Sequence, residues 1–353
     1  MDIALVTDAW HPQINGVVQT WTYMIRELTA LGHTVRVVTP DGARTIAAPS
    51  EPGLRLAINA RRHVAQALGE RAPDALHIAT EGPLGWAARR HALKRGWRFT
   101  TSYHTRFPEY LAHRFRIPAA LTYAVMRRFH APSQRVLVPT RAMHDELQAA
   151  GFERLQVWAR GVDGERFQPA AVPAQGSALP YPRPIWLNIG RVAPEKGLRA
   201  FLALDLPGTK VVVGDGAALP RLRARFPEVV WLGAQPHADL GKYYADADVF
   251  VFPSRTDTFG LVMLEANACG TPVAAFPVTG PINVVKPGLT GVLSEDLGDA
   301  CRRALQLDRA QVRAAALPYT WRAIADDLLG VLVPTVGQPD AAPSARVGLA
   351  AGR

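Results

Sequence analysis

The sequence has little of what marks a secreted, metal-stabilised or membrane-spanning protein. Its 353 residues include two cysteines, Cys269 and Cys301, which are too few for a disulfide framework and lack the spacing of a metal site. We expect both to be buried as small hydrophobic residues in a reducing compartment. There is no run of about eighteen apolar residues, and no basic leader precedes an apolar stretch at the amino terminus. These absences predict a cytoplasmic protein without a transmembrane helix or a signal peptide.

Acidic residues are scarce in one long segment. Between Trp86 and Arg141 the one acid is Glu109, against twelve lysines and arginines, so the net charge of +10 carried by the whole chain is concentrated there. Such a surface can face phosphates, an anionic membrane or nucleic acid, and a set of ordinary solvated arginines is the alternative. We favour peripheral attachment to the inner face of an anionic membrane, where each basic residue contributes about 1 kcal/mol.

The first half of the chain alternates short apolar runs with helical segments. Residues Ile3–Thr7, Val35–Thr39 and Ala75–Ile78 have the continuous apolar character of buried parallel strands. Val17–Leu31 is typical of a helix that Gly32 stops. The second half restarts the same alternation. Because repeated strand-then-helix units form doubly wound parallel sheets, we predict an α/β protein with two Rossmann-like domains that face a cleft.

A proline-rich stretch near the middle of the chain marks the expected domain boundary. Residues 169–184 contain five prolines among alanine, glycine and serine, which is the composition of a linker. We therefore predict one domain over residues 1–168 and a second over 185–320. A last helix at 321–333 is expected to pack back on the N-terminal domain, and the Pro-, Ala- and Gly-rich residues 334–353 are expected to be disordered.

The most informative stretch joins a strand to a helix. The predicted strand Val249–Phe252 ends in a polar loop that holds Asp257, and a helix begins near Gly260. The free N–H groups of its first turn favour a phosphate or a sugar hydroxyl. Asp257 and Glu265 can accept hydrogen bonds from hydroxyls on different parts of one ligand. The alternative is a loop acid that caps the helix and a glutamate on its solvated face.

A second stretch places two cations after a neighbouring strand. Gly190 and Arg191 follow the predicted strand Ile185–Ile189 directly, and Lys196 lies in the same loop. Two cations aimed at one place suit a diphosphate. The alternative is a turn with solvated charges.

Two stretches in the N-terminal half also follow predicted strands. Asn15 and Gly16 lie in the loop after the first strand, where a glycine permits close approach of the backbone to a ligand. His104 ends the strand Phe99–Tyr103. A turn glycine and a structural histidine are the alternatives. Because the carboxyl ends of parallel strands share one edge of a sheet, we expect all of these stretches to line one cleft.

Taken together, these motifs resemble those of GT-B fold, family-4 (group 1) retaining glycosyltransferases. The resemblance extends from Ile3 to about Leu332. The matching segments are 10–17 (WHPQINGV), 103–105 (YHT), 160–163 (RGVD) and 190–197 (GRVAPEKG), together with the acidic pair that has seven residues between its members. Among family members the sequence is similar to lipid-directed α-mannosyltransferases and sulfolipid synthases. The family usually has glutamate at both ends of the acidic pair, so Asp257 leaves the identity of the sugar open.

The resemblance implies that the C-terminal domain binds a nucleotide-diphosphate sugar and that the N-terminal domain binds the acceptor. Glu265 would take the ribose hydroxyls, and Arg191 and Lys196 would grip the diphosphate. Asp257 and the backbone at the start of the helix would hold the donor sugar. Gly16 would let the N-terminal loop close over the donor, and His104 would meet a far hydroxyl of the sugar. The candidate catalytic residues are His104, Arg191, Lys196 and Asp257. The candidate donor-binding residues are Asn15, Gly16, Gly190, Asp257, Phe259, Gly260, Leu261 and Glu265.

We predict transfer without a metal or another cofactor. Departure of a nucleoside diphosphate builds negative charge on a phosphate oxygen, and Arg191, Lys196 and the helix N-terminus are expected to stabilise it. Asp246 and Asp248 spell the D-x-D of metal-dependent glycosyltransferases, but they precede a strand and so belong at the amino edge of the sheet. Family membership implies retention of the anomeric configuration. No enzymatic nucleophile is evident, so front-face attack by the acceptor hydroxyl is the hypothesis.

Several alternatives stay open. GDP-mannose is the leading donor, a UDP-sugar-dependent transferase of the glucosyl or sulfoquinovosyl type is the alternative, and the acceptor is a lipid or a glycan. A nicotinamide oxidoreductase fits Gly214 and Gly216 after a strand, but its fingerprint needs a glycine where Leu219 stands. A nucleic-acid-binding protein fits the charge, but no helix-turn-helix, zinc or RNA-recognition signature is present, so we expect no nucleic-acid partner.

Overall fold

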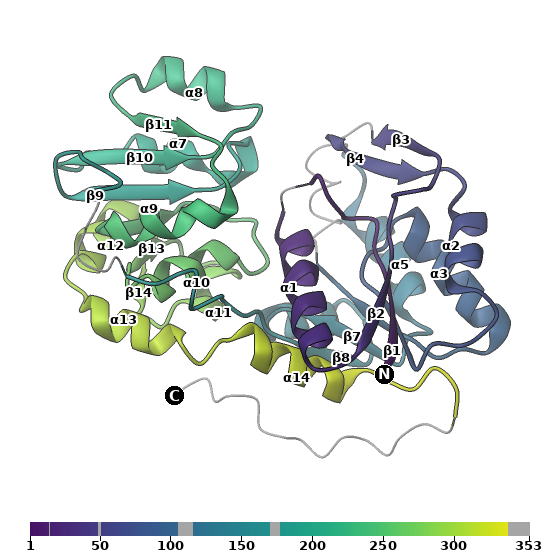
Figure 1. Ribbon diagram of the computed structural model, residues 1–353. Coiled ribbons are helices and arrows are strands. Elements are labelled where there is room, and N and C mark those ends of the chain that lie inside the picture. Colours follow the sequence, from purple (N-terminus) through teal and green to yellow (C-terminus); the bar gives the residue numbers. More distant parts are fainter. Residues whose placement is uncertain (14, 49–50, 105–115, 170–176, 338–353) are drawn as a thin grey trace.

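The computed structural model describes residues 1–13, 15–48, 51–104, 116–169 and 177–337. It has two α/β domains, each built on a six-stranded sheet whose strands are all parallel (Figure 1). This confirms the predicted fold class. Most of the predicted linker and the predicted tail beyond residue 337 lie outside the described residues.

The N-terminal sheet has the strand order β2-β1-β5-β6-β7-β8. Its strands are β1 (Asp2–Val6), β2 (Thr34–Val38), β5 (Ala75–Ile78), β6 (Thr100–Ser102), β7 (Arg135–Val138) and β8 (Leu155–Val157). The connecting helices are α1 (Gly16–Ala30), α2 (Ala60–Leu68), α3 (Pro83–Arg95), α5 (Ala119–His130) and α6 (Arg141–Ala149). A separate antiparallel hairpin, β3 (Thr45–Ala48) and β4 (Glu51–Ala57), lies outside this sheet.

The C-terminal sheet has the order β11-β10-β9-β12-β13-β14, which is the doubly wound order 3-2-1-4-5-6. Its strands are β9 (Ile185–Ile189), β10 (Thr209–Val213), β11 (Val230–Gly233), β12 (Val249–Phe252), β13 (Val273–Ala275) and β14 (Gly291–Leu293). Its helices are α7 (Leu198–Leu202), α8 (Leu219–Arg225), α9 (Leu240–Asp246), α10 (Leu261–Ala268), α11 (Pro281–Val284), α12 (Leu297–Ala304) and α13 (Arg309–Ala316), with 3₁₀ turns at Pro194–Lys196 and His237–Asp239.

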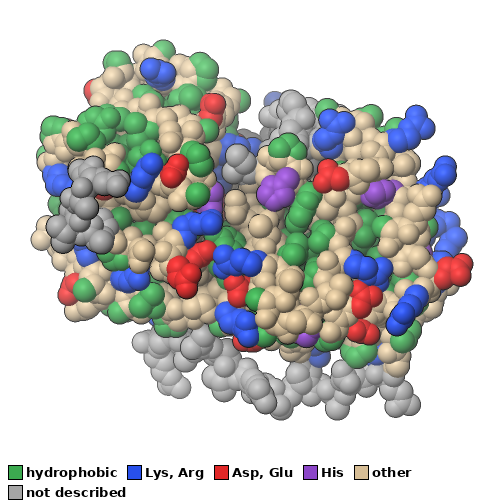
Figure 2. Space-filling model, viewed as in Figure 1, with side chains coloured by type: hydrophobic (Ala, Val, Ile, Leu, Met, Phe, Trp, Pro, Cys, Tyr) green, Lys and Arg blue, Asp and Glu red, His purple; other side chains and the backbone are tan. Residues whose placement is uncertain are grey.

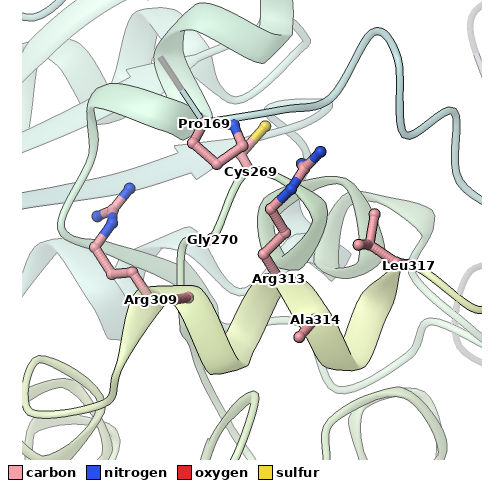
Figure 3. A pocket seen from close by; sticks show the side chains of 8 residues that line it. Pro169, Cys269, Gly270, Arg309, Arg313, Ala314 and Leu317 are labelled. Carbon is pink, nitrogen blue, oxygen red and sulfur yellow. The ribbon is translucent and has the colours of Figure 1, made fainter. Parts of the chain in front are cut away.

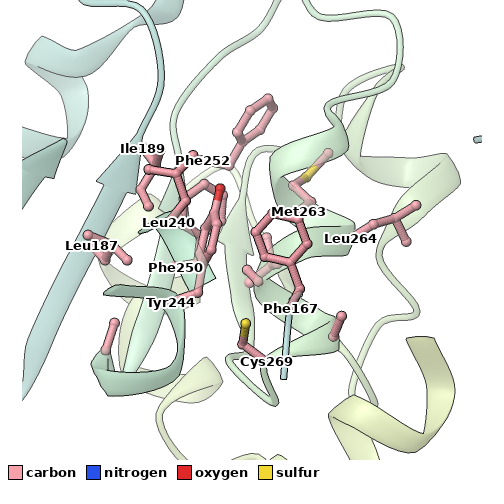
Figure 4. Packing of buried hydrophobic residues seen from close by; sticks show 14 of the residues in the cluster. Phe167, Leu187, Ile189, Leu240, Tyr244, Phe250, Phe252, Met263, Leu264 and Cys269 are labelled. Carbon is pink, nitrogen blue, oxygen red and sulfur yellow. The ribbon is translucent and has the colours of Figure 1, made fainter. Parts of the chain in front are cut away.

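The central strands of this sheet are buried on both faces because their sequences are almost entirely apolar. Phe250 belongs to the apolar cluster beside α10, together with Tyr244 of α9 and Met263 of α10 (Figure 4). All three side chains are fully buried. Burying a large apolar side chain contributes roughly 1.5–3 kcal/mol. The packing therefore fixes α10 against β12, and with it the loop between them.

The chain crosses between the domains twice. After the first crossing, Arg183 bonds both Asp246 and Asp248, at 2.8 and 2.7 Å, and so ties the end of the linker to the C-terminal sheet. On the way back, α14 (Trp321–Val331) runs under the N-terminal domain and packs on α1 (Figure 1). Trp321 stacks on Tyr23 of α1 with ring centroids 4.9 Å apart.

The segment after α14 corrects one prediction. Residues 334–337, which we expected to be disordered, are ordered against the N-terminal sheet. Pro334 pairs with Ala75, and the Thr335 backbone accepts a hydrogen bond from Arg98 N and donates one to Asp74 O, at 2.8 and 2.9 Å. Backbone pairing at the end of β5 outweighs a local composition that favours disorder.

The two cysteines lie as predicted. Cys269 and Cys301 are free thiols without exposed area. Burial raises the pKa of each to about 12, so neither is a reactive thiolate. No helix among the described residues is long and apolar enough to cross a bilayer.

One buried histidine makes stability depend on pH. Both ring nitrogens of His77 are hydrogen-bonded, to the hydroxyls of Thr100 and Ser102 at 2.8 and 2.9 Å. Burial, with a smaller effect of the Arg160 charge, lowers the pKa of His77 from 6.5 to about 3. The unfolded chain therefore gains a proton below about pH 6.5 that the folded chain does not, and stability falls as pH falls through this window.

We predict that His77 alone removes about 2 kcal/mol of stability at about pH 5. In His77→Asn the slope of the unfolding free energy against pH, between about pH 6.5 and 4, should therefore be smaller by the equivalent of close to one proton. Denaturant titrations at several pH values measure this slope. The exposed His11, changed to Asn, serves as the control and should leave the slope as it is. An equal slope in wild type and His77→Asn would contradict the assignment.

Candidate active site

The site is positioned by the reversal of strand order in the C-terminal sheet. The order turns back between β9 and β12, which are direct neighbours. The loops that leave their carboxyl ends, residues 190–197 and 253–260, therefore emerge side by side. Ligands of doubly wound sheets bind at this point, where the connections run to opposite faces and leave a crevice.

The two loops are in direct contact. Lys196 Nζ lies 2.6 Å from Asp257 Oδ1, and Thr256 Oγ1 donates to the Glu195 carbonyl at 3.3 Å. A Cβ on Gly197 would lie 2.5 Å from the carbonyl oxygen of Pro253, and Gly197 has a φ of +65°, so glycine is required here on both counts. The structure thus brings together the predicted lysine and the first predicted acid.

Asp257 has one oxygen committed and one available. Oδ1 receives Lys196, whereas Oδ2 is buried and has no hydrogen-bond partner among the described residues. A buried carboxylate oxygen without a donor is costly. A ligand hydroxyl that donates to Oδ2 would remove this cost.

Gly190 and Arg191 begin the first of these loops. A Cβ on Gly190 would meet no atom within 4 Å, so the backbone here borders open space. Arg191 is half-exposed and bonds Glu195 at 2.7 Å, one turn along the same loop. The carboxylate of Glu195 therefore holds the Arg191 guanidinium within its own loop, near the end of β9.

The helix α10 begins at the same edge. Gly260 precedes it with a φ of +88°, and no side chain caps its first turn. Side chains of the N-cap residues cap α1, α6, α12, α13 and α14, whereas α5, α8 and α9 are uncapped like α10. Phe259 is 9% exposed and Leu261 is partly buried, and both side chains belong to the apolar packing beside the start of the helix. The N–H groups of the first turn carry the positive end of the helix dipole.

Glu265 lies one turn inside α10 and is 8% exposed. The Tyr244 hydroxyl donates to its Oε2 at 3.0 Å, and His237 Nε2 lies 3.1 Å from its Oε1. Burial, and then the Glu265 charge, raise the pKa of Tyr244 well above 10, so this hydroxyl remains a donor. Both oxygens of the second predicted acid are thus oriented by the protein.

A chain of hydrogen bonds extends from Glu265 to the N-terminal domain. Arg166 Nη1 donates to His237 Nδ1 at 3.3 Å and to the Tyr23 hydroxyl of α1 at 3.2 Å. Because Arg166 can only donate, Nδ1 is the acceptor in this contact, and Nε2 is the ring nitrogen that donates to Glu265. Burial raises the pKa of Tyr23 to about 12. Sequence reasoning missed His237, Tyr244 and Arg166, since their contacts are between residues far apart in the chain.

The N-terminal domain reaches the same place from the other side. A Cβ on Gly16 would lie 3.8 Å from Leu261 Cδ1, and the His104 carbonyl accepts a hydrogen bond from Thr258 Oγ1 at 3.2 Å. Asn15, which we predicted to bind the donor, directly precedes α1, and its side-chain oxygen accepts from Val17 N and Val18 N, both at 3.0 Å. It caps α1 rather than offering this oxygen to a ligand.

His104 sits between two donors. Arg160 Nη2 lies 3.0 Å from its Nδ1, and Trp21 Nε1 lies 3.2 Å from its Nε2. Burial, then the charge of Arg160, lower the pKa of His104 well below 6.5, so the ring is neutral. Burial also lowers the pKa of Arg160 to about 9. This guanidinium is 4% exposed, lies over the Trp158 ring, and bonds carbonyl oxygens rather than a carboxylate among the described residues. The sequence of the segment 160–163 (RGVD) did not predict that Arg160 contacts His104.

The D-x-D acids lie away from the crevice. Both Asp246 and Asp248 bond Arg183, and Asp248 Oδ2 also accepts from Ile185 N at 2.7 Å, at the amino end of β9. Asp246 and Asp248 therefore hold Arg183, at the end of the linker, against the C-terminal domain. No group of three or more His, Cys, Asp and Glu side chains suited to a metal occurs within the described ranges.

A hollow of about 370 Å³ lies at the opposite end of α10, beside Cys269 and Gly270 (Figure 3). Arg309 and Arg313 of α13 border it, and both donate to protein oxygens: Arg309 to Ala245 O at 2.8 Å and Arg313 to Phe167 O at 3.3 Å. It is a packing feature between α10 and α13 and is remote from the strand ends that carry the acids and cations.

The fold defines the class of the protein. Sucrose-phosphate synthase from Thermosynechococcus elongatus superposes with a TM-score of 0.74, at 21% identity over 94% of this chain and 98% of that one. Anabaena Alr3699/HepE, solved with UDP and glucose, superposes with a TM-score of 0.70, at 16% identity over 94% and 98%. Two parallel-sheet domains arranged in this way are the GT-B architecture of glycosyltransferases.

The sequence defines the family. The Glycosyltransferase Family 4 pattern matches residues 14–166, and the Glycosyl transferases group 1 pattern matches residues 183–307. A GDP-mannose-dependent alpha-mannosyltransferase of Mycobacterium tuberculosis is 32% identical over 93% of this chain and 95% of its own. The Sulfoquinovosyl transferase SQD2 of Arabidopsis thaliana is 29% identical over 88% and 69%. The chain belongs to the family-4, group 1 glycosyltransferases, and it is a transferase rather than an oxidoreductase.

We predict that Lys196→Ala lowers kcat by roughly 10²–10³, the usual effect of removing one preorganised donor to developing charge. The variant also leaves Asp257 without its cation, so its fold should be checked by circular dichroism and thermal unfolding. Lys242→Ala is the matched control, because Lys242 is a half-exposed lysine of the same domain. A folded Lys196→Ala enzyme with wild-type kcat would contradict the role.

We predict that His237→Ala raises the KM for the donor about tenfold with little change in kcat, because an oriented hydrogen bond to Glu265 is lost. His237→Asn, which keeps a side-chain donor, should recover part of the effect. His144→Ala removes a histidine that pairs with the exposed Asp145 of the other domain and serves as the control. If kcat falls and KM does not change, His237 does not act through donor binding.

Proposed function

We propose that the protein transfers a hexose, with mannose from GDP-mannose as the leading case, to a hydroxyl of a lipid or glycan acceptor without a metal ion. The observation that carries the proposal is the convergence at one sheet edge of Lys196, Asp257 and the uncapped start of α10. The mannosyltransferase likeness over nearly the full length of the chain supports the choice of donor.

The geometry suits the parts of a nucleotide-diphosphate sugar. The diphosphate would be held by Arg191, Lys196 and the N–H groups at the start of α10, where positive charge and the helix dipole coincide. The ribose hydroxyls would bond Glu265, whose two oxygens are fixed by Tyr244 and His237. A hydroxyl of the donor sugar would donate to Asp257 Oδ2, which is buried and unpartnered among the described residues.

The chemical step follows from these placements. The bond between the anomeric carbon and the β-phosphate oxygen breaks, and the negative charge on that oxygen is stabilised by Lys196, Arg191 and the α10 dipole. The acceptor hydroxyl attacks the same face of the sugar, and its proton passes to the departing phosphate oxygen. This course retains the anomeric configuration and requires no enzymatic nucleophile. The His104 ring is neutral and both of its nitrogens face protein donors, Arg160 and Trp21, so it adds no charge beside the sugar.

Transfer without a metal is supported by the chemistry of the side chains. The proposed diphosphate site offers two cations, Lys196 and Arg191, each paired with one carboxylate, and the D-x-D acids are engaged by Arg183 at the other edge of the sheet. Charge stabilisation by arginine, lysine and a helix N-terminus can take the place of a divalent ion.

A UDP-sugar is the second candidate donor. The similarity to the Sulfoquinovosyl transferase SQD2 supports a sugar other than mannose. Asp257, whose side chain is shorter than glutamate, leaves the identity of the sugar open.

We predict that GDP-mannose stabilises the protein more than any UDP-sugar. At a concentration 100 times its dissociation constant a ligand adds roughly 2.7 kcal/mol, which a thermal-shift assay detects. A panel of GDP- and UDP-sugars should be measured with and without EDTA, and Lys196→Ala should lose most of the shift. A larger shift with UDP-glucose would contradict GDP-mannose as the donor and favour a UDP-sugar. A shift that EDTA abolishes would contradict metal-independent binding.

A further inference from the structure

The segment in which the chain first crosses between the domains contacts both of them. Residues 163–167, the crossing segment, come shortly after β8 and before the linker. A Cβ on Gly241 of α9 would lie 2.7 Å from the Arg166 carbonyl oxygen, and Arg313 of α13 donates to Phe167 O at 3.3 Å. The backbone of the crossing segment is therefore held on the C-terminal domain. Figure 2 shows Lys and Arg side chains beside Asp and Glu side chains at the boundary between the two domains of Figure 1.

Toward the C-terminal domain, the crossing segment holds His237 from two sides. The Phe167 ring is buried and meets the His237 ring edge-on, with centroids 5.4 Å apart, and Arg166 Nη1 donates to His237 Nδ1 at 3.3 Å. Phe167 also packs on Tyr244, with centroids 5.9 Å apart (Figure 4). His237 and Tyr244 are the side chains that bond the two oxygens of Glu265. The crossing segment thus contacts both partners of this acid.

Toward the N-terminal domain, the same segment is bound to α1. Arg166 Nη1 also donates to the Tyr23 hydroxyl, at 3.2 Å. Asp163 accepts from Arg26 Nη1 at 3.1 Å and from Arg166 N at 3.2 Å, and the Arg26 guanidinium lies 4.8 Å from the centre of the Tyr23 ring. Burial opposes ionisation of Asp163, but the bonds from Arg166 N and Arg26 leave its pKa below the usual value, so it is a carboxylate. One arginine side chain therefore joins α1 to the ring that orients Glu265.

We propose that Tyr23 and Arg166 are positioning residues for the donor, so that the N-terminal domain sets the affinity for the nucleotide sugar through His237 and Glu265. The inference rests on the proposed function, in which Glu265 binds the ribose hydroxyls. A carboxylate that is already held in place loses less conformational freedom when a ligand binds. Hydrogen-bonded side-chain networks transmit such constraints from one member to the next.

This role predicts a particular kinetic signature. The ribose is remote from the bond that breaks, so its hydroxyls are bound equally in the ground state and in the transition state. Loss of such uniform binding raises KM and leaves kcat unchanged. Arg166 is exposed, so water competes for its hydrogen bonds and the effect is modest. A purely structural contact between the domains would instead lower Tm and kcat.

The first test is Tyr23→Phe, which removes the hydroxyl and keeps the ring that stacks on Trp321. We expect the KM for the donor to rise about threefold, the usual value of one hydrogen bond, with kcat and Tm unchanged. Arg166→Met should raise KM at least as much, and Arg166→Lys, which keeps a charged donor, should recover part of the loss. Tyr123→Phe is the matched control, because it removes a hydroxyl that bonds Glu146 at 3.5 Å on the far side of the N-terminal sheet from α1.

A double-mutant cycle tests the route. In His237→Ala the connection to Glu265 is already broken, so adding Tyr23→Phe should raise KM no further. An equal rise in both backgrounds would show that Tyr23 does not act through His237 and would overturn the inference. An unchanged KM in Tyr23→Phe would overturn it as well, and so would a fall in Tm and kcat without a change in KM.

Nucleotide binding separates this inference from the proposed function. Wild type and Tyr23→Phe should be titrated calorimetrically with GDP and with UDP. We expect the preferred nucleotide to bind Tyr23→Phe about three times more weakly than wild type. Equal binding to the two proteins would remove the role of Tyr23 and leave the transferase function standing. Failure of wild type to bind either nucleotide would remove both.

Discussion

The site depends on the reversal of strand order between β9 and β12. This single topological feature makes the loops 190–197 and 253–260 neighbours and allows Lys196 to reach Asp257 at 2.6 Å. Gly197 lets the two loops touch, because any side chain there would meet the Pro253 carbonyl. The apolar packing of α10 on β12 then fixes the uncapped start of the helix beside this ion pair. The topology of the sheet therefore sets the positions of Lys196, of Asp257 and of the start of α10.

The second feature of the site is that both domains build it. Gly16 meets Leu261, the His104 carbonyl accepts from Thr258, and Arg166 links Tyr23 with the His237 ring that orients Glu265. The two segments in which the chain crosses between the domains lie close to each other. A Cβ on Gly161 would lie 2.6 Å from Trp321 N, so the first crossing and the return helix α14 pack against each other. Any change in the relative position of the domains therefore changes the surroundings of Glu265.

Much of the fold could be predicted because local sequence determines it. The strands Ile185–Ile189 and Val249–Phe252 are apolar except for Asn188, and their bounds match the prediction. The helix Pro83–Arg95 likewise begins at a proline and ends before Gly96. The order of strands could be anticipated only in outline, because the hairpin β3–β4 and the helix α5 carry no comparably clear pattern.

The candidate site could be predicted in its parts but not in its partners. The residues after each strand could be found from sequence because parallel strands end at one edge. The pairing of Lys196 with Asp257, of His237 with Glu265 and of Arg160 with His104 joins residues 61, 28 and 56 positions apart, and no local pattern encodes such contacts. The capping contact of Asn15 could not be told from a ligand contact, because a side chain that caps a helix and one that binds a ligand look alike in sequence.

The most direct test is a crystal structure of the protein with GDP-mannose bound. The account predicts diphosphate oxygens within about 3 Å of Lys196 and Arg191, ribose hydroxyls on Glu265, and a sugar hydroxyl on Asp257 Oδ2. A well-ordered nucleotide that touches neither Lys196 nor the start of α10 would contradict it.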